Sequence, residues 1–321
     1  MSEENNKYPE FNPEPEENNQ NDNPDLVISK VSPILAAFIG LIGGFFLYQI
    51  VGGLLTLIIF GMDFEKAPIN SLRLITVAGQ LLFILLPALV FAKYFYENVD
   101  KIIRLRIPNP KEVTLFTLGI FILTPLLQSY LYVQNYIIEI LAENFGIIKT
   151  LKELFDNLNA LVEKTYSNLL QASNGFEFLF VVFVVAVVPA ISEEVMFRGF
   201  IQRSFEQKLH PIIAGLLTAV FFSFYHFNPY GFIPLAILGF YFGIAAYYSK
   251  SLIIPIFLHF LNNFSAISIY HIAGSSELIK SDVKAGADEL KFYLISILIL
   301  GGLFALLLVS IKKYYSSQQI K

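Results

Sequence analysis

The sequence contains no cysteine. This absence excludes disulfides, thiolate nucleophiles and thiolate metal sites. Charged residues are scarce as well, at 15% of 321 residues, whereas soluble domains carry roughly 25%. Hydrophobic residues make up 55% of the chain, and the mean hydropathy is +0.60. Several apolar runs reach the ~20 residues that a helix needs to cross a bilayer. Composition therefore predicts an all-α, polytopic membrane protein whose first partner is the lipid bilayer.

Two common signatures of hydrolytic enzymes are also missing from the sequence. The Gly-x-Ser-x-Gly motif that is typical of many serine hydrolases is absent. The His-Glu-x-x-His motif of the common zinc proteases is absent too. No basic groove interleaved with aromatic residues is present, so a nucleic-acid partner is not expected. The chemistry that remains belongs to carboxylates, amides and four histidines, which are His210, His226, His259 and His271.

Hydropathy predicts about eight transmembrane helices that enclose a catalytic cavity. Their approximate ranges are 32–60, 72–92, 113–141, 176 to the charged cluster at 193–198, 211–227, 232–248, 252–272 and 292–311. The predicted organisation follows from these spans. It consists of a disordered acidic tail (1–27), N-terminal transmembrane helices (28–142), an amphipathic interfacial helix (143–175), a catalytic helical core (176–272), and a polar loop with the last helix and a short tail (273–321).

Two of these segments are predicted from composition rather than from hydropathy. The tail is rich in Asn, Glu and Pro, buries too little apolar surface to fold, and is too acidic to be a signal peptide. Between 145 and 175, apolar residues recur at helical spacing and alternate with charged ones. We expect this helix to lie at the membrane interface or against the bundle.

The distribution of basic residues predicts the orientation. With eight spans both termini share a side, and that side holds fourteen lysines and arginines against eight on the other. Because loops rich in Lys and Arg stay inside, both termini are predicted to be cytoplasmic.

A charged cluster ends a long uncharged stretch at 178–190. Glu194 and Arg198 are spaced i, i+4 and can form an ion pair across one helical turn. Glu193 projects about 100° away and is left without that partner. Such groups are costly in a membrane, which makes them candidates for function. The alternative is a juxtamembrane salt bridge beside a solvated carboxylate.

Three further polar residues, His226, His259 and Asn263, stand in apolar surroundings. A single intramembrane His more often makes a packing hydrogen bond, but several costly groups satisfy one another only by converging on a cavity. His226 and Glu193 can meet only if the fourth helix continues past Arg198. No Gly or Pro between 200 and 209 prevents this.

These residues suit hydrolysis of an amide bond. A carboxylate and a His can polarise a water, while a second His and an Asn amide can donate to an oxyanion. A set of Glu, His, His and Asn can also hold a divalent metal that activates the water. In that version the ligands would be Glu193, His226 and His259.

Three motifs carry a resemblance to a known family. They are Glu-Glu-x-x-x-Arg at 193–198, Phe-x-x-x-His at 222–226 and His-x-x-x-Asn at 259–263. In this order they resemble the CAAX protease and bacteriocin-processing enzyme family, intramembrane endopeptidases related to the type II CAAX prenyl endopeptidase. The resemblance covers roughly 176–270.

The resemblance implies a role for each residue. Glu193 would be the general base, with His226 as its partner in activating water. His259 and Asn263 would stabilise the oxyanion, with Glu194, Arg198 and Phe222 in support. The family has been described both as zinc-type metalloproteases and as glutamate-dependent proteases, so a divalent metal such as zinc, or none, is expected. The implied substrate is a membrane protein or peptide, and the implied location is a bacterial cytoplasmic membrane.

Two other functions compete with this interpretation. A non-catalytic scaffold or bacteriocin immunity protein could share the fold, although a scaffold gains nothing from retaining costly ionisable groups. A transporter could use Glu and His to relay protons, but no inverted repeats are visible in the sequence.

Overall fold

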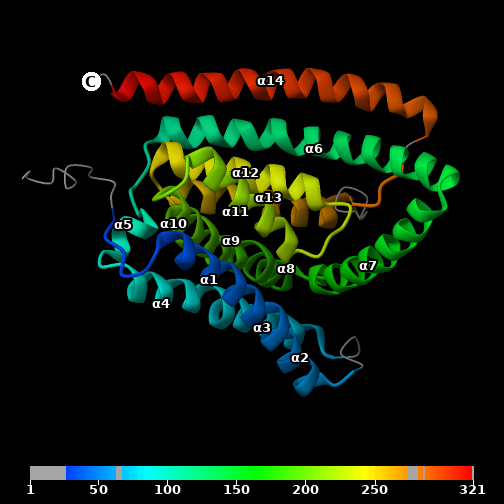
Figure 1. The fold of residues 1–321 in the computed structure, drawn as a ribbon. Coiled ribbons are helices and arrows are strands. Elements are labelled where there is room, and N and C mark those ends of the chain that lie inside the picture. The colour runs from blue at the N-terminus through cyan, green and yellow to red at the C-terminus, as the bar shows by residue number, and fades with distance from the viewer. Residues whose placement is uncertain (1–26, 63–66, 274–280, 285, 320–321) are drawn as a thin grey trace, which may run out of the picture.

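The structure, a computed structural model, describes residues 27–62, 67–273, 281–284 and 286–319. In these ranges the chain forms long helices that lie beside one another in a bundle (Figure 1). The only β pairing found there is two isolated bridges. The predicted all-α class is thus confirmed. The predicted disordered tail lies, except for Val27, outside the described residues.

Seven helices in the described ranges are long and apolar enough to cross a membrane. They are Pro33–Phe60, Ile69–Phe95, Pro110–Asn144, Gly175–Glu206, Phe232–Ser249, Ile253–Ile272 and Ala287–Gln318. The predicted span at 211–227 is instead a shorter helix, α11 (Pro211–Tyr225), of 15 residues. It falls below the ~20 residues of a full span. The polytopic bundle is confirmed, and the number of about eight stays a prediction.

The helices run between two ends of the bundle (Figure 1). At one end, the amide of Val27 donates to Gln207, and Arg104 forms an ion pair with Glu206. The C-terminal end of α14 (Ala287–Gln319) lies there too. At the other end, Asn135 donates to the carbonyls of Ser281 and Val283. We call these the terminal end and the opposite end.

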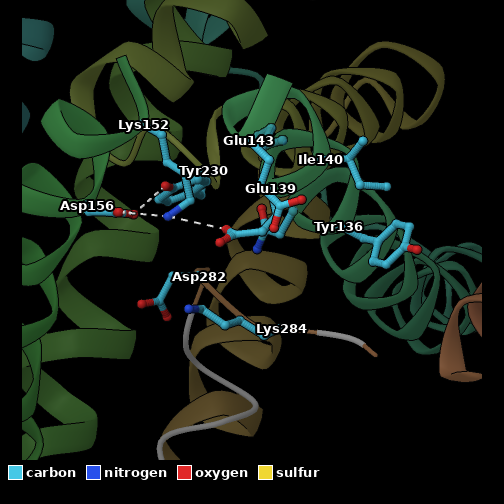
Figure 2. A pocket seen from close by; sticks show the side chains of 11 residues that line it. Tyr136, Glu139, Ile140, Glu143, Lys152, Asp156, Tyr230, Asp282 and Lys284 are labelled. Carbon is cyan, nitrogen blue, oxygen red and sulfur yellow. Dashed lines mark hydrogen bonds and ion pairs between the residues drawn. The ribbon is translucent and has the colours of Figure 1, made fainter. Parts of the chain in front are cut away.

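The helix α7 (Gly146–Leu170) closes part of the opposite end with an unusual orientation. Its leucines face outward, since Leu154 and Leu161 are each 52% exposed. Its polar side faces the bundle, where Lys152 pairs with Asp156 and with Glu139 of α6 (Pro110–Asn144), as Figure 2 shows. An outward apolar face suits contact with lipid.

The same polar side of α7 contacts the turn that follows α11. The Tyr230 hydroxyl donates to the Asp156 carboxylate (Figure 2). Partial burial acts to raise the pKa of Asp156, but the hydrogen bonds from Tyr230 and Lys152 outweigh it and hold that pKa below its ordinary value. Asp156 is therefore ionised at neutral pH and links α7 to this turn.

The fourth span is one continuous helix that passes through the middle of the bundle. It consists of α8 (Gly175–Val182), the π-helical η4 (Phe183–Val187), α9 (Val188–Glu194), the π-helical η5 (Val195–Gln202) and α10 (Arg203–Glu206). All eight residues of η5, Phe197 and Phe200 among them, are buried, as expected of a helix segment that is packed on all sides. The helix continues past Arg198, which is the condition for Glu193 to reach His226.

Candidate active site

The predicted pair of Glu194 and Arg198 is present and fully buried. Arg198 Nη1 lies 2.8 Å from Glu194 Oε1, and the two side chains are 1% and 0% exposed. The guanidinium also donates to the carbonyl of Gly239 at 2.8 Å, and it lies over the Phe222 ring, 4.5 Å from its centroid. The charge is thus balanced by a carboxylate, a carbonyl and an aromatic face.

Glycine at position 239 makes this contact possible. Gly239 belongs to α12 (Phe232–Ser249), which packs against the Arg198 side chain. A Cβ at this position would lie 2.9 Å from a ring carbon of Phe222 and 3.0 Å from Arg198 Nη2. Both distances are shorter than a relaxed carbon contact. Any larger residue would therefore displace the Phe222 ring or the Arg198 guanidinium.

His259 is the third member of this buried group. It lies on α13 (Ile253–Ala273), and its Nδ1 is 2.8 Å from Glu194 Oε1. Its ring stacks on Phe242 at a centroid distance of 5.5 Å. Because an ionised carboxylate only accepts, Nδ1 carries the proton that is donated to Glu194. The remaining polar atom of His259 is Nε2.

Glu193 and His226 form a second group. His226 follows the last residue of α11, and its Nε2 lies 4.0 Å from Glu193 Oε2. His226 Nδ1 donates to the carbonyl of Phe222 at 2.8 Å, which leaves Nε2 as the atom that faces the carboxylate. Glu193 Oε2 is buried and has no hydrogen-bond partner among the described residues. A buried, unpartnered carboxylate oxygen beside an imidazole suits a general base.

Gln80 belongs to this second group, although the sequence analysis did not single it out. Its Nε2 donates to Glu193 Oε1 at 3.0 Å and lies 3.3 Å from the Tyr48 hydroxyl. Gln80 is 4% exposed and begins the π-helical η3 (Gln80–Leu85) of the second span. The sequence does contain a signal for Gln80, which is a side-chain amide in the middle of an apolar run. Polar residues in a membrane are costly, so such a residue is a candidate for function.

Asn263 lies one turn beyond His259, but its amide is engaged elsewhere. Asn263 Nδ2 donates to the carbonyl of Val185 at 3.0 Å. Val185 lies in the π-helical η4, and Asn263 thereby ties α13 to this part of the fourth span. The second N–H of the amide is still available to a ligand.

The three predicted metal ligands are not gathered into one cluster in the described ranges, where no three His, Asp or Glu side chains are grouped as metal ligands. Glu193 and His226 lie together. His259 donates through Nδ1 to Glu194, which leaves Nε2 as the atom that could ligate a metal. A divalent metal such as zinc takes three or four protein ligands, and the metal version of the site stays a prediction.

Phe222 connects the two groups. Its carbonyl holds His226, and its ring contacts Arg198 and lies 6.0 Å from the His259 ring. Six of the seven residues singled out by the motifs are thus linked by contacts, and Asn263 lies one helical turn beyond His259. The predicted catalytic cavity stays a prediction, since none of these seven residues lines either of two hollows of about 430 and 380 Å³ in the described part of the chain.

Comparison with known proteins agrees with this geometry. Residues 175–265 match the family model described as "Type II CAAX prenyl endopeptidase Rce1-like". Comparisons with curated proteins and with solved structures found no match. The match contains every motif residue from Glu193 to Asn263, while Gln80 and α7 lie outside it. Through residues 175–265, the chain is thus similar to the type II CAAX prenyl endopeptidase family, in agreement with the resemblance that its motifs carry.

Proposed function

We propose that this protein is an intramembrane endopeptidase that hydrolyses a peptide bond of a membrane protein or peptide by Glu/His activation of water. The observation that carries the proposal is the pair of Glu193 Oε2 and His226 Nε2, which face each other at 4.0 Å. Each has its other polar atom fixed, Glu193 by Gln80 and His226 by Phe222. Two oriented proton acceptors therefore point at the same place.

A water molecule fits between these two acceptors. A water that donates one hydrogen bond of about 2.8 Å to each acceptor spans roughly 4.4 Å, given its bond angle. The observed 4.0 Å is close to that value. With both hydrogens held, the oxygen presents a lone pair to a carbonyl carbon, and Glu193 takes the proton as the bond forms. Glu193 and His226 would thus orient the water and accept its proton, and this step requires no metal.

His259 and Asn263 are the proposed donors to the oxyanion. Asn263 can use its second amide hydrogen while the first stays on Val185. His259 donates through Nε2 only when its ring is protonated, since Glu194 accepts the proton at Nδ1. The Glu194 carboxylate is placed to stabilise that imidazolium. Its pairing with Arg198 fixes the position of the carboxylate.

The activity is tested by incubating the purified full-length protein with a library of membrane-spanning peptides. Cleavage products are identified by mass spectrometry, with and without a chelator, beside a measurement of bound metal. We expect cleavage that survives chelation. No cleavage of any peptide would favour a scaffold or immunity protein of the same fold, and loss of cleavage together with bound metal would favour a metalloprotease.

We also propose that the terminal end faces the cytoplasm of a bacterial cell, as the basic loops favour. A reporter fused after Lys321, or inserted between 93 and 111, should then read cytoplasmic, and one near Gly286 should read external. A reporter after Lys321 that reads external would reverse the orientation and reject this proposal.

Gln80→Met should lower kcat about ten- to hundredfold and change KM little. The change keeps the side-chain length but removes a hydrogen bond to a charged carboxylate, worth roughly 1.5–3 kcal/mol. Gln80→His, which retains a ring N–H donor, should regain part of the rate. Gln128→Met, the same change in α6 (Pro110–Asn144), is the matched control. Equal activity of Gln80→Met and Gln128→Met would remove Gln80 from the site.

Asn263→Ala should lower kcat about 10²–10³-fold, the typical cost of losing one oxyanion donor. KM should change little, because the oxyanion exists only in the transition state. Steady-state kinetics separate the two parameters, and Asn262→Ala is the control on the same helix. A raised KM with unchanged kcat would instead assign Asn263 to substrate binding.

A further inference from the structure

A basic hollow of about 380 Å³ lies at the terminal end, away from the proposed active site. Three segments that are distant in the sequence form it. They are the stretch from α5 (Val99–Ile103) to residue 106, the end of the fourth span at α10, and the turn after α12. The residues that line it are Asp100, Lys101, Arg104, Leu105, Arg106, Arg203 and Lys250.

The described residues that line this hollow are mainly cations. Five of them are lysines or arginines, and Asp100 is the carboxylate among them. Glu206 pairs with Arg104 and lies 3.5 Å from Arg203, and Arg106 pairs with Glu112 at 2.7 Å. A lining rich in lysine and arginine attracts an anion.

One donor in the hollow lacks an acceptor. Arg104 Nη1 is buried and has no hydrogen-bond partner among the described residues, and the Arg104 side chain is only 11% exposed. Buried donors are nearly always satisfied, so an unsatisfied one calls for an explanation. An anionic oxygen that enters the hollow would supply the acceptor.

The backbone that carries two of the cations is held in a strained conformation. Arg104 and Lys250 both have positive φ, 54° and 47°, a region that residues other than glycine seldom adopt. The amide of Leu252 donates to the Arg104 carbonyl at 2.9 Å, and Leu105 bridges to Ser251. These contacts hold the two strained residues side by side. Both residues end a helix, α5 and α12, in the left-handed conformation that commonly terminates helices, and the two helix ends thereby bring their side chains to the hollow.

We infer that this hollow binds an anionic phosphate group, from the headgroup of an acidic lipid or from a phosphate-bearing solute. The planar forks of the arginines match phosphate oxygens. The hollow lies at an end of the bundle, where headgroups surround a membrane protein, and basic clusters at such positions bind acidic lipids. None of the residues that line the hollow belongs to the proposed protease site, so phosphate binding here is independent of that function.

The test measures lipid binding to the full-length protein in detergent by native mass spectrometry. The probes are phosphatidylglycerol and, at equal concentration, phosphatidylcholine, with inorganic phosphate as a competitor. Lys101→Gln and Lys250→Asn should each weaken phosphatidylglycerol binding about fivefold, from the energy typical of one lysine near an anionic surface. Asparagine is chosen at position 250 because it tolerates positive φ.

The control is Lys313→Asn, which removes an exposed lysine of α14 outside the hollow and should leave binding unchanged. The melting temperature of each variant checks that the fold is intact. If millimolar inorganic phosphate does not displace phosphatidylglycerol from the protein, the hollow binds a lipid headgroup. If it does displace the lipid, the hollow binds a phosphate-bearing solute. Equal binding of the two lipids with no effect of phosphate would overturn the inference, as would a loss for Lys313→Asn equal to that for Lys250→Asn.

Discussion

Glu193→Gln should abolish cleavage, with kcat lowered up to about 10⁴-fold, the upper range for a general base. Glutamine has the same shape as glutamate and retains an oxygen that accepts from Gln80. It can no longer take a proton from water. We therefore expect the melting temperature to stay close to that of the unmodified protein while turnover disappears.

The matched control for this experiment is Glu177→Gln. Glu177 lies in the first turn of the same continuous helix, where its backbone amide is capped by Asn174, far along the helix from Glu193. The two variants lose the same charge from the same helix, and only one of them loses the proposed base. Turnover by Glu193→Gln within twofold of the Glu177→Gln value would exclude Glu193 from the chemistry.

Arg198→Ala should destabilise the protein by about 3–5 kcal/mol, the usual cost of removing one partner of a buried ion pair. The Glu194 carboxylate would be left in the bundle interior with His259 as its hydrogen-bond partner. The bond to the Gly239 carbonyl and the contact with the Phe222 ring would be lost as well. The free energy of unfolding in a denaturing detergent measures the effect.

Two comparisons make this prediction specific. Arg198→Lys keeps the charge but lacks the planar fork that reaches both Glu194 and Gly239, so an intermediate loss is expected. Lys152→Ala removes a cation from a pair near the surface, where its partner Asp156 is 46% exposed. Such pairs contribute about 0–1 kcal/mol. If Arg198→Ala were as stable as Lys152→Ala, the buried pair would not support the bundle.

The parts of the site that lie within one helix could be predicted from the sequence. The spacing of Glu194 and Arg198 gave their pairing, and the same geometry left Glu193 without a partner within its own helix. The residues between 200 and 209, which include no Gly or Pro, permitted the helix to continue past Arg198. In each case local spacing along one helix determines the contact.

Contacts between helices could not be predicted in this way. The bond from His259 to Glu194 depends on how α13 packs against α9, and that packing is not encoded in the spacing of either helix. Gln80 lies 113 residues from Glu193, and no motif contains it. The orientation of α7 could not be predicted either. In water its apolar face would pack against the protein interior, whereas in a membrane the same face can contact lipid instead.

The end of α11 differed from the prediction for a local reason. The apolar run continues to Phe227, so hydropathy extended the span that far. The helix instead stops at Tyr225, and Phe227 adopts a left-handed conformation with φ 46°. The chain turns at His226 and holds its ring against the Phe222 carbonyl.

The short length of α11 sets the depth at which the proposed chemistry would take place. A helix of 15 residues rises about 22 Å, whereas the hydrocarbon layer is about 30 Å thick. If α11 starts at the headgroups of the terminal end, His226 lies roughly 7 Å below the far surface of that layer. From the opposite end, water would have to reach only this depth. Under the proposed function, a substrate would be cut about one helical turn inside its membrane segment, so that turn would have to unwind before its carbonyl is exposed to Glu193.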